Sequence, residues 1–343
     1  NYLCHLLVLS FLFIYGSASA QNDSAYFDLG RIQLRKDFTQ HITIKGSDLE
    51  HMPFARVSDA LAPWLHGTLT SKPKLVYVVD GNLLNDMDAY SIHDIEEITL
   101  IQNAVAQVNG SLNNQQLVLV KTKRRHESSK GITVAGSTYL ANQDYPKDYN
   151  LESENALYHQ YHLGAWQNLG RIRFGASANW MRDVSPVGKS VFETHKTPQL
   201  NRFRFNGWVD ATLAAGHTLT LALNVSPQTS SQDITLFNAA SAENIITKAK
   251  GTIINPSLRL SNRLTDEWLH ELDLSYFTNR APSDTRRLSD YFAPASANFE
   301  SLNHTVFKSE QFLLRDRVSF TKNLGAWQIR AGVSFTYRKF KQE

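Results

Sequence analysis

The chain has 343 residues, of which 20% are charged and 42% hydrophobic, and its 35 basic and 32 acidic residues leave a net charge of +3. So small a net charge argues against a nucleic-acid binder that works through a strong basic field. The only cysteine, Cys4, excludes a disulfide scaffold and a thiolate metal site. The informative feature is therefore the pattern of apolar residues along the chain.

The amino terminus has the pattern of a secretory signal. An apolar run from Leu6 to Tyr15 is too short to cross a bilayer, which needs roughly 20 residues. It is followed by small residues that end in an Ala-Ser-Ala cleavage site at Ala18 to Ala20. We predict that residues 1–20 are a signal peptide, with a buried N-terminal helix as the alternative. The mature chain is then an exported protein that begins at Gln21.

Residues 21–130 predict a small α+β domain. A β-branched strand over residues 74–79 ends at the turn pair Asp80-Gly81. Ser91 and Asp94 have the spacing of a capping box that opens a short helix. Strands are expected at 97–101 and 117–122. The basic stretch at 121–125 is expected to link this domain to the next one, with no nucleic acid as partner.

From Gly131 onward the apolar residues alternate with polar ones, which is typical of strands. Phe174 and Val209, for example, fall on apolar faces, whereas Arg173 and Asp210 fall on polar faces. Each segment is about ten residues long, as expected for a strand that crosses the hydrocarbon core of a membrane. We predict nine strands, at 132–141, 156–166, 171–181, 202–213, 218–226, 253–263, 269–278, 310–320 and 327–338.

The connections favour a transmembrane barrel. Short turns are predicted at 167–170, 214–217, 264–268 and 321–326. They alternate with long loops at 142–155, 182–201, 227–252 and 279–309. Short turns on one side and long loops on the other are the layout of an outer-membrane barrel. Aromatic residues near the strand ends fit the girdles of such a barrel: Trp166, Trp180, Trp268, Tyr276, Trp327 and Tyr337.

Two alternatives remain beside the closed barrel. A soluble β-sandwich also shows alternating strands. Nine is an odd number, whereas bacterial single-chain barrels close with an even number of strands. We therefore expect residues 131–343 to form the N-terminal part of a barrel that is incomplete in this chain, unless one strand has been miscounted.

The small domain resembles a known family. Leu75 to Gly81, then Asp94-Ile95-Glu96 with Glu97 and Ile98, then residues 117–123, are similar to the plug domain of TonB-dependent outer-membrane transporters. The similarity is greatest to the SusC-like branch, and residues 57–61 are similar to the early helix of that plug. The plug-motif residues here are Asp80, Gly81, Asp94, Ile95 and Glu96.

The resemblance implies a location, partners and a function. It implies an outer-membrane protein, surrounded by outer-membrane lipid, that takes up a scarce ligand such as a glycan, peptide or metal chelate. Contact with the TonB complex would rearrange the plug, and a surface lipoprotein is a possible partner. Only 16 residues separate Leu61 from Val78, fewer than in the family. A structural or adhesive outer-membrane protein with a vestigial plug, which transports nothing, is therefore the alternative.

Charge suggests how the two parts are held together. Residues 46–100 contain three basic and nine acidic residues, whereas residues 131–343 contain 23 basic and 19 acidic ones. We expect Arg171, Arg173, Arg202 and Arg204 to face the lumen and pair with the acidic plug. A merely solvated lumen arginine is the alternative. The sequence contains no motif for catalysis, metal or cofactor, so no enzyme is predicted.

Overall fold

The structure is a computed structural model with two β-sheet units. It describes residues 26–28, 33–36, 40–51, 57–61, 64, 74–80, 82–84, 87, 89–101, 115–123, 130–143, 154–184, 193–237, 241–291, 299–324 and 327–342. The predicted signal peptide at 1–20 and Gly81 lie outside these residues. No helix among them is long and apolar enough to cross a membrane.

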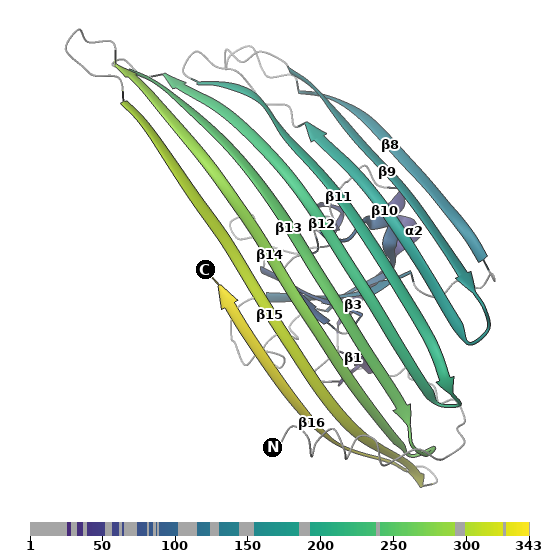
Figure 1. Ribbon diagram of the computed structural model, residues 1–343. Helices are drawn as coiled ribbons and strands as arrows, with labels where there is room; N and C mark the ends of the chain where they lie inside the picture. Colours follow the sequence, from purple (N-terminus) through teal and green to yellow (C-terminus); the bar gives the residue numbers. More distant parts are fainter. Residues whose placement is uncertain are drawn as a thin grey trace.

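The larger unit is a single antiparallel sheet in which each strand pairs with its neighbours in the chain (Figure 1). The predicted nine strands are all present. In order across the sheet they are β8 (Lys130–Gln143), β9 (Glu154–Asn168), β10 (Ile172–Val184), β11 (Glu193–Ala214), β12 (His217–Phe237), β13 (Ser241–Arg263), β14 (Trp268–Tyr291), β15 (Phe299–Leu324) and β16 (Trp327–Gln342).

The strands are longer than the sequence pattern predicted. β15 has 26 residues and β14 has 24, and much of the predicted long loops at 182–201, 227–252 and 279–309 is strand. The prediction of loops there was wrong because alternation of apolar residues stops where both faces become polar. The ladder of backbone hydrogen bonds continues beyond that point, since it requires no apolar face.

The two faces of the large sheet differ in polarity as predicted. Phe174, Val209 and Ile329 lie on the convex face with 38%, 38% and 49% of their surface exposed. Asn179, on the concave face, is buried, as is Arg204 opposite it on the next strand. One expected girdle residue is on the other face. Trp166 pairs with Gly175 on the concave side, because its position in β9 has the same parity as the buried His162.

The smaller unit contains a five-stranded sheet in the order β3-β6-β7-β4-β5, in which only β4 and β7 are parallel. Its strands are β3 (His41–Lys45), β4 (Lys74–Val79), β5 (Asn82–Leu84), β6 (Ile95–Ile101) and β7 (Gln115–Thr122). Two short helices, α2 (Gly46–Glu50) and α3 (Val57–Leu61), contribute Leu49 and Leu61 to its apolar core. A separate pair is formed by β1 (Tyr26–Asp28) and β2 (Gln33–Arg35).

Asp80 fixes the end of β4. Its backbone has a positive φ of 46°, a conformation that aspartate tolerates better than most residues. Its carboxylate accepts hydrogen bonds from the Thr122 backbone N–H at 3.0 Å and from the Thr122 hydroxyl at 2.6 Å. The predicted turn residue therefore also ties β4 to the end of β7.

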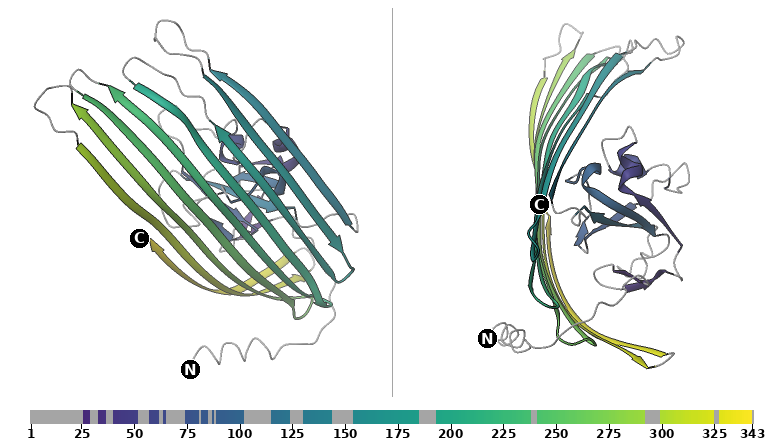
Figure 2. Two further views of the ribbon diagram at one scale, coloured as in Figure 1. Left: turned by 45° about the horizontal axis from the view of Figure 1, so that its top comes forward. Right: turned by 90° about the vertical axis from the view of Figure 1, so that its right-hand side faces the viewer.

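The smaller unit lies against the concave face of the large sheet (Figure 2). The large sheet curves around it in the right-hand view, and the convex face points away. The polar concave face and the small α+β unit consequently share one interface, which includes the candidate site.

Candidate functional site

Asp94 lies at the centre of the contact between the two units. It ends the 3-10 helix η4 (Ile92–Asp94), whose N-cap Ser91 accepts a hydrogen bond from the His93 N–H at 3.3 Å. In a complete capping box the third residue would reach back to the N-cap backbone. The Asp94 carboxylate instead points at the large sheet, and the residue is 8% exposed.

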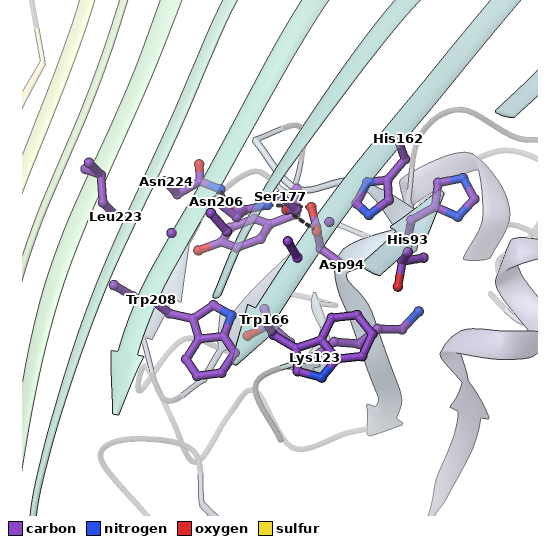
Figure 3. Close-up of a pocket in the computed structure, with 18 of the residues that line it drawn as sticks. His93, Asp94, Lys123, His162, Trp166, Ser177, Asn206, Trp208, Leu223 and Asn224 are labelled. Atoms are coloured by element: carbon purple, nitrogen blue, oxygen red, sulfur yellow. Dashed lines mark hydrogen bonds between the residues drawn. The ribbon is translucent and has the colours of Figure 1, made fainter. Parts of the chain in front are cut away.

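Three strands of the large sheet provide polar partners around this carboxylate (Figure 3). The Ser177 hydroxyl donates to one oxygen at 2.5 Å, and the Asn206 side-chain amide donates to the other at 2.5 Å. Asn224 in turn donates to the Asn206 side chain and to the Ala89 carbonyl, the latter at 3.0 Å. We call Asp94, Ser177, Asn206 and Asn224 the Asp94 junction.

Weaker polar contacts and an apolar contact flank the junction. Gln160 donates to the Ser91 hydroxyl at 3.4 Å, and Asn255 donates to the Tyr90 hydroxyl at 3.4 Å. Ile253 and Phe277 of the large sheet join the apolar core of the smaller unit. The smaller unit is therefore held by neutral donors, one carboxylate and a limited apolar contact.

A cluster of charged and titratable side chains lies beside the junction, within the smaller unit. Lys123 forms an ion pair with Glu50, and His93 lies 3.9 Å from the same carboxylate. Burial raises the pKa of Glu50, but hydrogen bonds and attraction from His93 and Lys123 outweigh it and lower this pKa to about 2. His162 of β9 approaches from the other unit, with its ring centroid 5.2 Å from that of His93.

A cavity of about 60 Å³ lies between the two units beside the Asp94 junction. That volume has room for a few water molecules at most. Trp166 and Trp208 form part of its lining, and each covers a glycine of a neighbouring strand. A Cβ added to Gly131 would come within 2.1 Å of the Trp166 ring, and one added to Gly175 within 2.9 Å of the Trp208 ring. Glycine is therefore needed beneath both rings.

The predicted plug-motif residues fall at structural and contact positions. Asp94 makes the contacts above, and Ile95 is fully buried in the core of the smaller unit. Glu96 is exposed, and Asp80 closes the β4 turn. Gly81 lies outside the described residues.

The four predicted pairing arginines are spread over the large sheet. Arg171 is exposed just before β10, and Arg173 lies 3.8 Å from Asp210 of the next strand. Arg202 donates to Gln228, and Arg204 donates to Asn179 at 2.8 Å. Their pairing with acidic side chains of the smaller unit stays a prediction.

The residues that hold Asp94 were not singled out from the sequence. Ser177, Asn206 and Asn224 do fall on the predicted polar faces of their strands, but so do many other residues. Their alignment depends on register, in which Ser177 faces Asn206 and Asn206 faces Asn224. A row of small polar residues at matching heights on three consecutive strands is the signal that could have identified them.

The junction joins one carboxylate to neutral hydrogen-bond donors. Its donors are neutral amides and a hydroxyl, which water can replace when the surfaces separate. A bidentate arginine pair would hold the carboxylate more strongly. Among the described residues, no group of three His, Cys, Asp or Glu side chains could hold a metal ion.

Comparisons with known proteins give likenesses of structure. No family model matches the chain, and no curated protein matches it. The RagAB peptide importer in its closed-closed state matches with a TM-score of 0.49 at 9% identity, over 89% of this chain and 55% of that one. The ferric yersiniabactin uptake receptor FyuA of Yersinia pestis matches with a TM-score of 0.46 at 10% identity, over 89% and 60%. FpvA of Pseudomonas aeruginosa, bound to heterologous pyoverdines, matches with a TM-score of 0.47 at 11% identity, over 96% and 57%.

The chain thus spans little more than half the length of these solved structures.

Proposed function

We propose that this chain is part of a TonB-dependent outer-membrane transporter that admits a scarce ligand such as a glycan, peptide or metal chelate. Residues 21–130 are its plug, and residues 131–343 are the N-terminal part of its barrel wall. The Asp94 junction is the seat that holds the plug against the wall. The chain has no enzymatic role in this proposal.

The observation that carries the proposal is the apolar band on the convex face. On β14 the outward positions are apolar from Leu272 to Tyr276, between His270 and Thr278. The eight residue steps between these two polar positions, at about 3.3 Å each, extend roughly 26 Å along the strand. With a tilt of about 40°, that length corresponds to roughly 20 Å along the membrane normal, which approaches the roughly 25 Å height of the apolar band in outer-membrane barrels.

The exposed apolar face argues against a soluble β-sandwich. In a sandwich one apolar face of the sheet would be buried against a second sheet. Here Leu221, Leu223 and Phe174 on the convex face are 38–42% exposed. The concave face, which a sandwich would fill with apolar side chains, instead carries the polar contacts to the smaller unit.

The position of the smaller unit supports its assignment as a plug. It occupies the hollow of the curved wall, where it would obstruct a lumen (Figure 2). Transport would require its contacts with the wall to separate, and the neutral hydrogen-bond donors of the Asp94 junction are compatible with this. By the resemblance to the family, force from TonB would disturb these contacts, and a surface lipoprotein would deliver the ligand from outside.

Membrane insertion is tested first. Spin labels on cysteines replacing Phe174, Val209 and Ile329 should report a lipid environment in reconstituted vesicles. Labels at Thr220 and Ser319, which lie on the opposite face, should report contact with water or protein. Recovery of the protein from the soluble periplasm without detergent would exclude the membrane wall altogether.

Transport is tested with a reversible disulfide crosslink between the plug and the wall. An Asp94→Cys, Ser177→Cys double variant would join plug to wall through a disulfide. Uptake of a pooled set of labelled peptides, oligosaccharides and ferric chelates should require TonB, stop on oxidation of the double variant and return on reduction. Each single variant is the matched control. Uptake that persists without TonB would contradict the proposed mechanism, and a lack of uptake by the intact protein would favour the structural or adhesive alternative.

A further inference from the structure

Basic side chains gather on the convex face immediately beyond the apolar band. They come from four consecutive strands, β13 to β16, and we call them the basic belt: Lys250, Arg280, Lys308, Lys339 and Lys341. Their outward direction follows from register, because each has the parity of an outward apolar residue on its own strand. Glu310 is the acidic residue among them, and Lys308 contacts it at 2.8 Å.

The belt places like charges opposite one another. Arg280 pairs directly with Lys308 across β14 and β15. Side chains at such positions are about 5 Å apart at Cβ, and like charges there destabilise a sheet. Lys341 lies opposite Glu310, and Lys339 lies two residues before Lys341 on the same face of β16. Five cations around one carboxylate leave a surplus of positive charge, which a multivalent anion would neutralise.

An apolar groove ends at this belt. It has a volume of about 990 Å³ and extends from Gln167 on β9 to Phe312 on β15, and near the belt its outward lining includes Leu258, Leu274, Tyr276 and Phe312. Phe312 faces Lys339 in the pairing of β15 with β16, and the Tyr276 hydroxyl donates to Glu310 at 3.1 Å. The apolar groove and the cationic belt are therefore continuous.

We propose that the groove and the belt together bind one class of occupant, an outer-leaflet lipid with a phosphorylated headgroup. Its acyl chains lie in the groove, and its phosphate lies among Arg280, Lys339 and Lys341. This proposal rests on the membrane insertion proposed above. The belt lies on the side of the band away from the short turns at 215–216 and 264–267, which is the outer side in that arrangement.

Charge alone does not explain the site, because the belt is confined to one part of the wall. At the corresponding outward positions β12 has Thr229 and Ser231, and β11 has Gln199 and Asn201, and the next basic residue in this row is Arg182 on β10. A general attraction to anionic lipid would favour basic residues all around the wall. The belt is therefore a cluster at one end of the groove, flanked by two strands with neutral residues at these positions, which indicates a localised binding site.

The test uses the protein in phosphatidylcholine nanodiscs that contain 5% of either phosphorylated lipid A or its dephosphorylated form. Native mass spectrometry counts the bound glycolipid, and fluorescence titration gives its dissociation constant. The wild-type protein should bind the phosphorylated form at least tenfold more tightly. An Arg280→Gln, Lys339→Gln, Lys341→Gln variant should lose this preference. A control with Lys130, Arg263 and Lys322 changed to Gln, which removes equal charge at the short-turn end, should keep it.

Two further measurements distinguish binding of the whole lipid from binding of its phosphate alone. Phe312→Ala should weaken binding of the phosphorylated lipid, and 10 mM inorganic phosphate should not displace it, since the acyl chains contribute. Equal affinity of the wild-type protein for the two lipids, or an unchanged preference in the triple glutamine variant, would overturn the proposal. Failure of the protein to enter nanodiscs would instead count against the proposed membrane wall.

Discussion

Replacing Asp94 by asparagine should loosen the contact between the smaller unit and the large sheet without removing the core contacts of the smaller unit. The Asp94 carboxylate accepts one hydrogen bond from Ser177 and one from Asn206. Asparagine has nearly the same size, but its amide presents a donor where one of these bonds needs an acceptor, and it carries no charge. The backbone bond from the Asp94 N–H to the Ser91 carbonyl is unaffected.

The expected magnitude follows from these two bonds. A hydrogen bond to a charged group contributes about 1.5–3 kcal/mol, and the substitution removes the charge from both bonds and the acceptor from one. We expect a loss of roughly 2–3 kcal/mol in the free energy that holds the plug in its seat. Since about 1.4 kcal/mol is a factor of ten, the separated state should become about 30- to 140-fold more populated.

The assay is maleimide labelling of an Ala89→Cys variant in lipid vesicles, on a Cys4→Ser background. Ala89 is 2% exposed, and its carbonyl contacts Asn224 of the wall, so labelling should require separation of the two surfaces. Asp48→Asn, which removes an exposed carboxylate from the same unit, is the matched control. Combined with Ser177→Ala, the Asp94→Asn effect should be less than additive. A labelling rate within twofold of the Asp48→Asn control would refute the assignment of Asp94 as the seat.

Three further predictions concern the pH response, packing and membrane depth. Because the pKa of Glu50 is lowered from 4.5 to about 2, its contribution to stability should be complete above pH 4.5 and disappear as the pH falls toward 2. Chemical denaturation at pH 5 and pH 2.5 should show a smaller pH-dependent loss in Glu50→Gln, and an equal loss would disprove the assignment. Gly46→Ala would place a Cβ 1.9 Å from the Ile95 carbonyl oxygen and should destabilise the smaller unit by about 1–3 kcal/mol in the same denaturation assay, whereas the exposed Ser47→Ala should have little effect. Leu223→Arg, in the middle of the apolar band, should reduce stability in refolding into bilayers by about 2–4 kcal/mol, against about 0–1 kcal/mol for Thr252→Arg at its edge, and equal costs would contradict the proposed depth.

Sequence reasoning predicted the elements with local signals. The strand at residues 74–79 and the faces of β10 to β12 follow from short patterns of residue types, and the structure contains them. The helix at 57–61, which was expected from the family resemblance, is also present. The ends of the long strands could not be predicted in this way. On β12, for example, both faces are polar from Gln228 to Asp233, so the apolar alternation stops there although the pairing with β13 continues to Phe237.

The candidate site was harder to predict because it depends on register between strands. Asp94 was selected through the family resemblance, whereas Ser177 and Asn206 are ordinary polar residues until pairing brings them to one height. Arginines drew attention in the sequence because of their charge. The structure places Arg173 beside Asp210 of its own sheet, where neighbouring side chains are available at lower cost in side-chain ordering.

The unusual length of the hairpins bears on what the cell surface presents to its surroundings. From Arg280 to Tyr291, β14 continues for eleven residues past the apolar band, which is about 36 Å along the strand. Inserted as proposed, this part would rise nearly 30 Å above the lipid headgroups at a tilt of about 40°. Bacteriophages, antibodies and bulky nutrients would then contact these projecting strands before they reached the glycolipid surface. The projecting strands would therefore determine which of them reach the extracellular opening of the barrel.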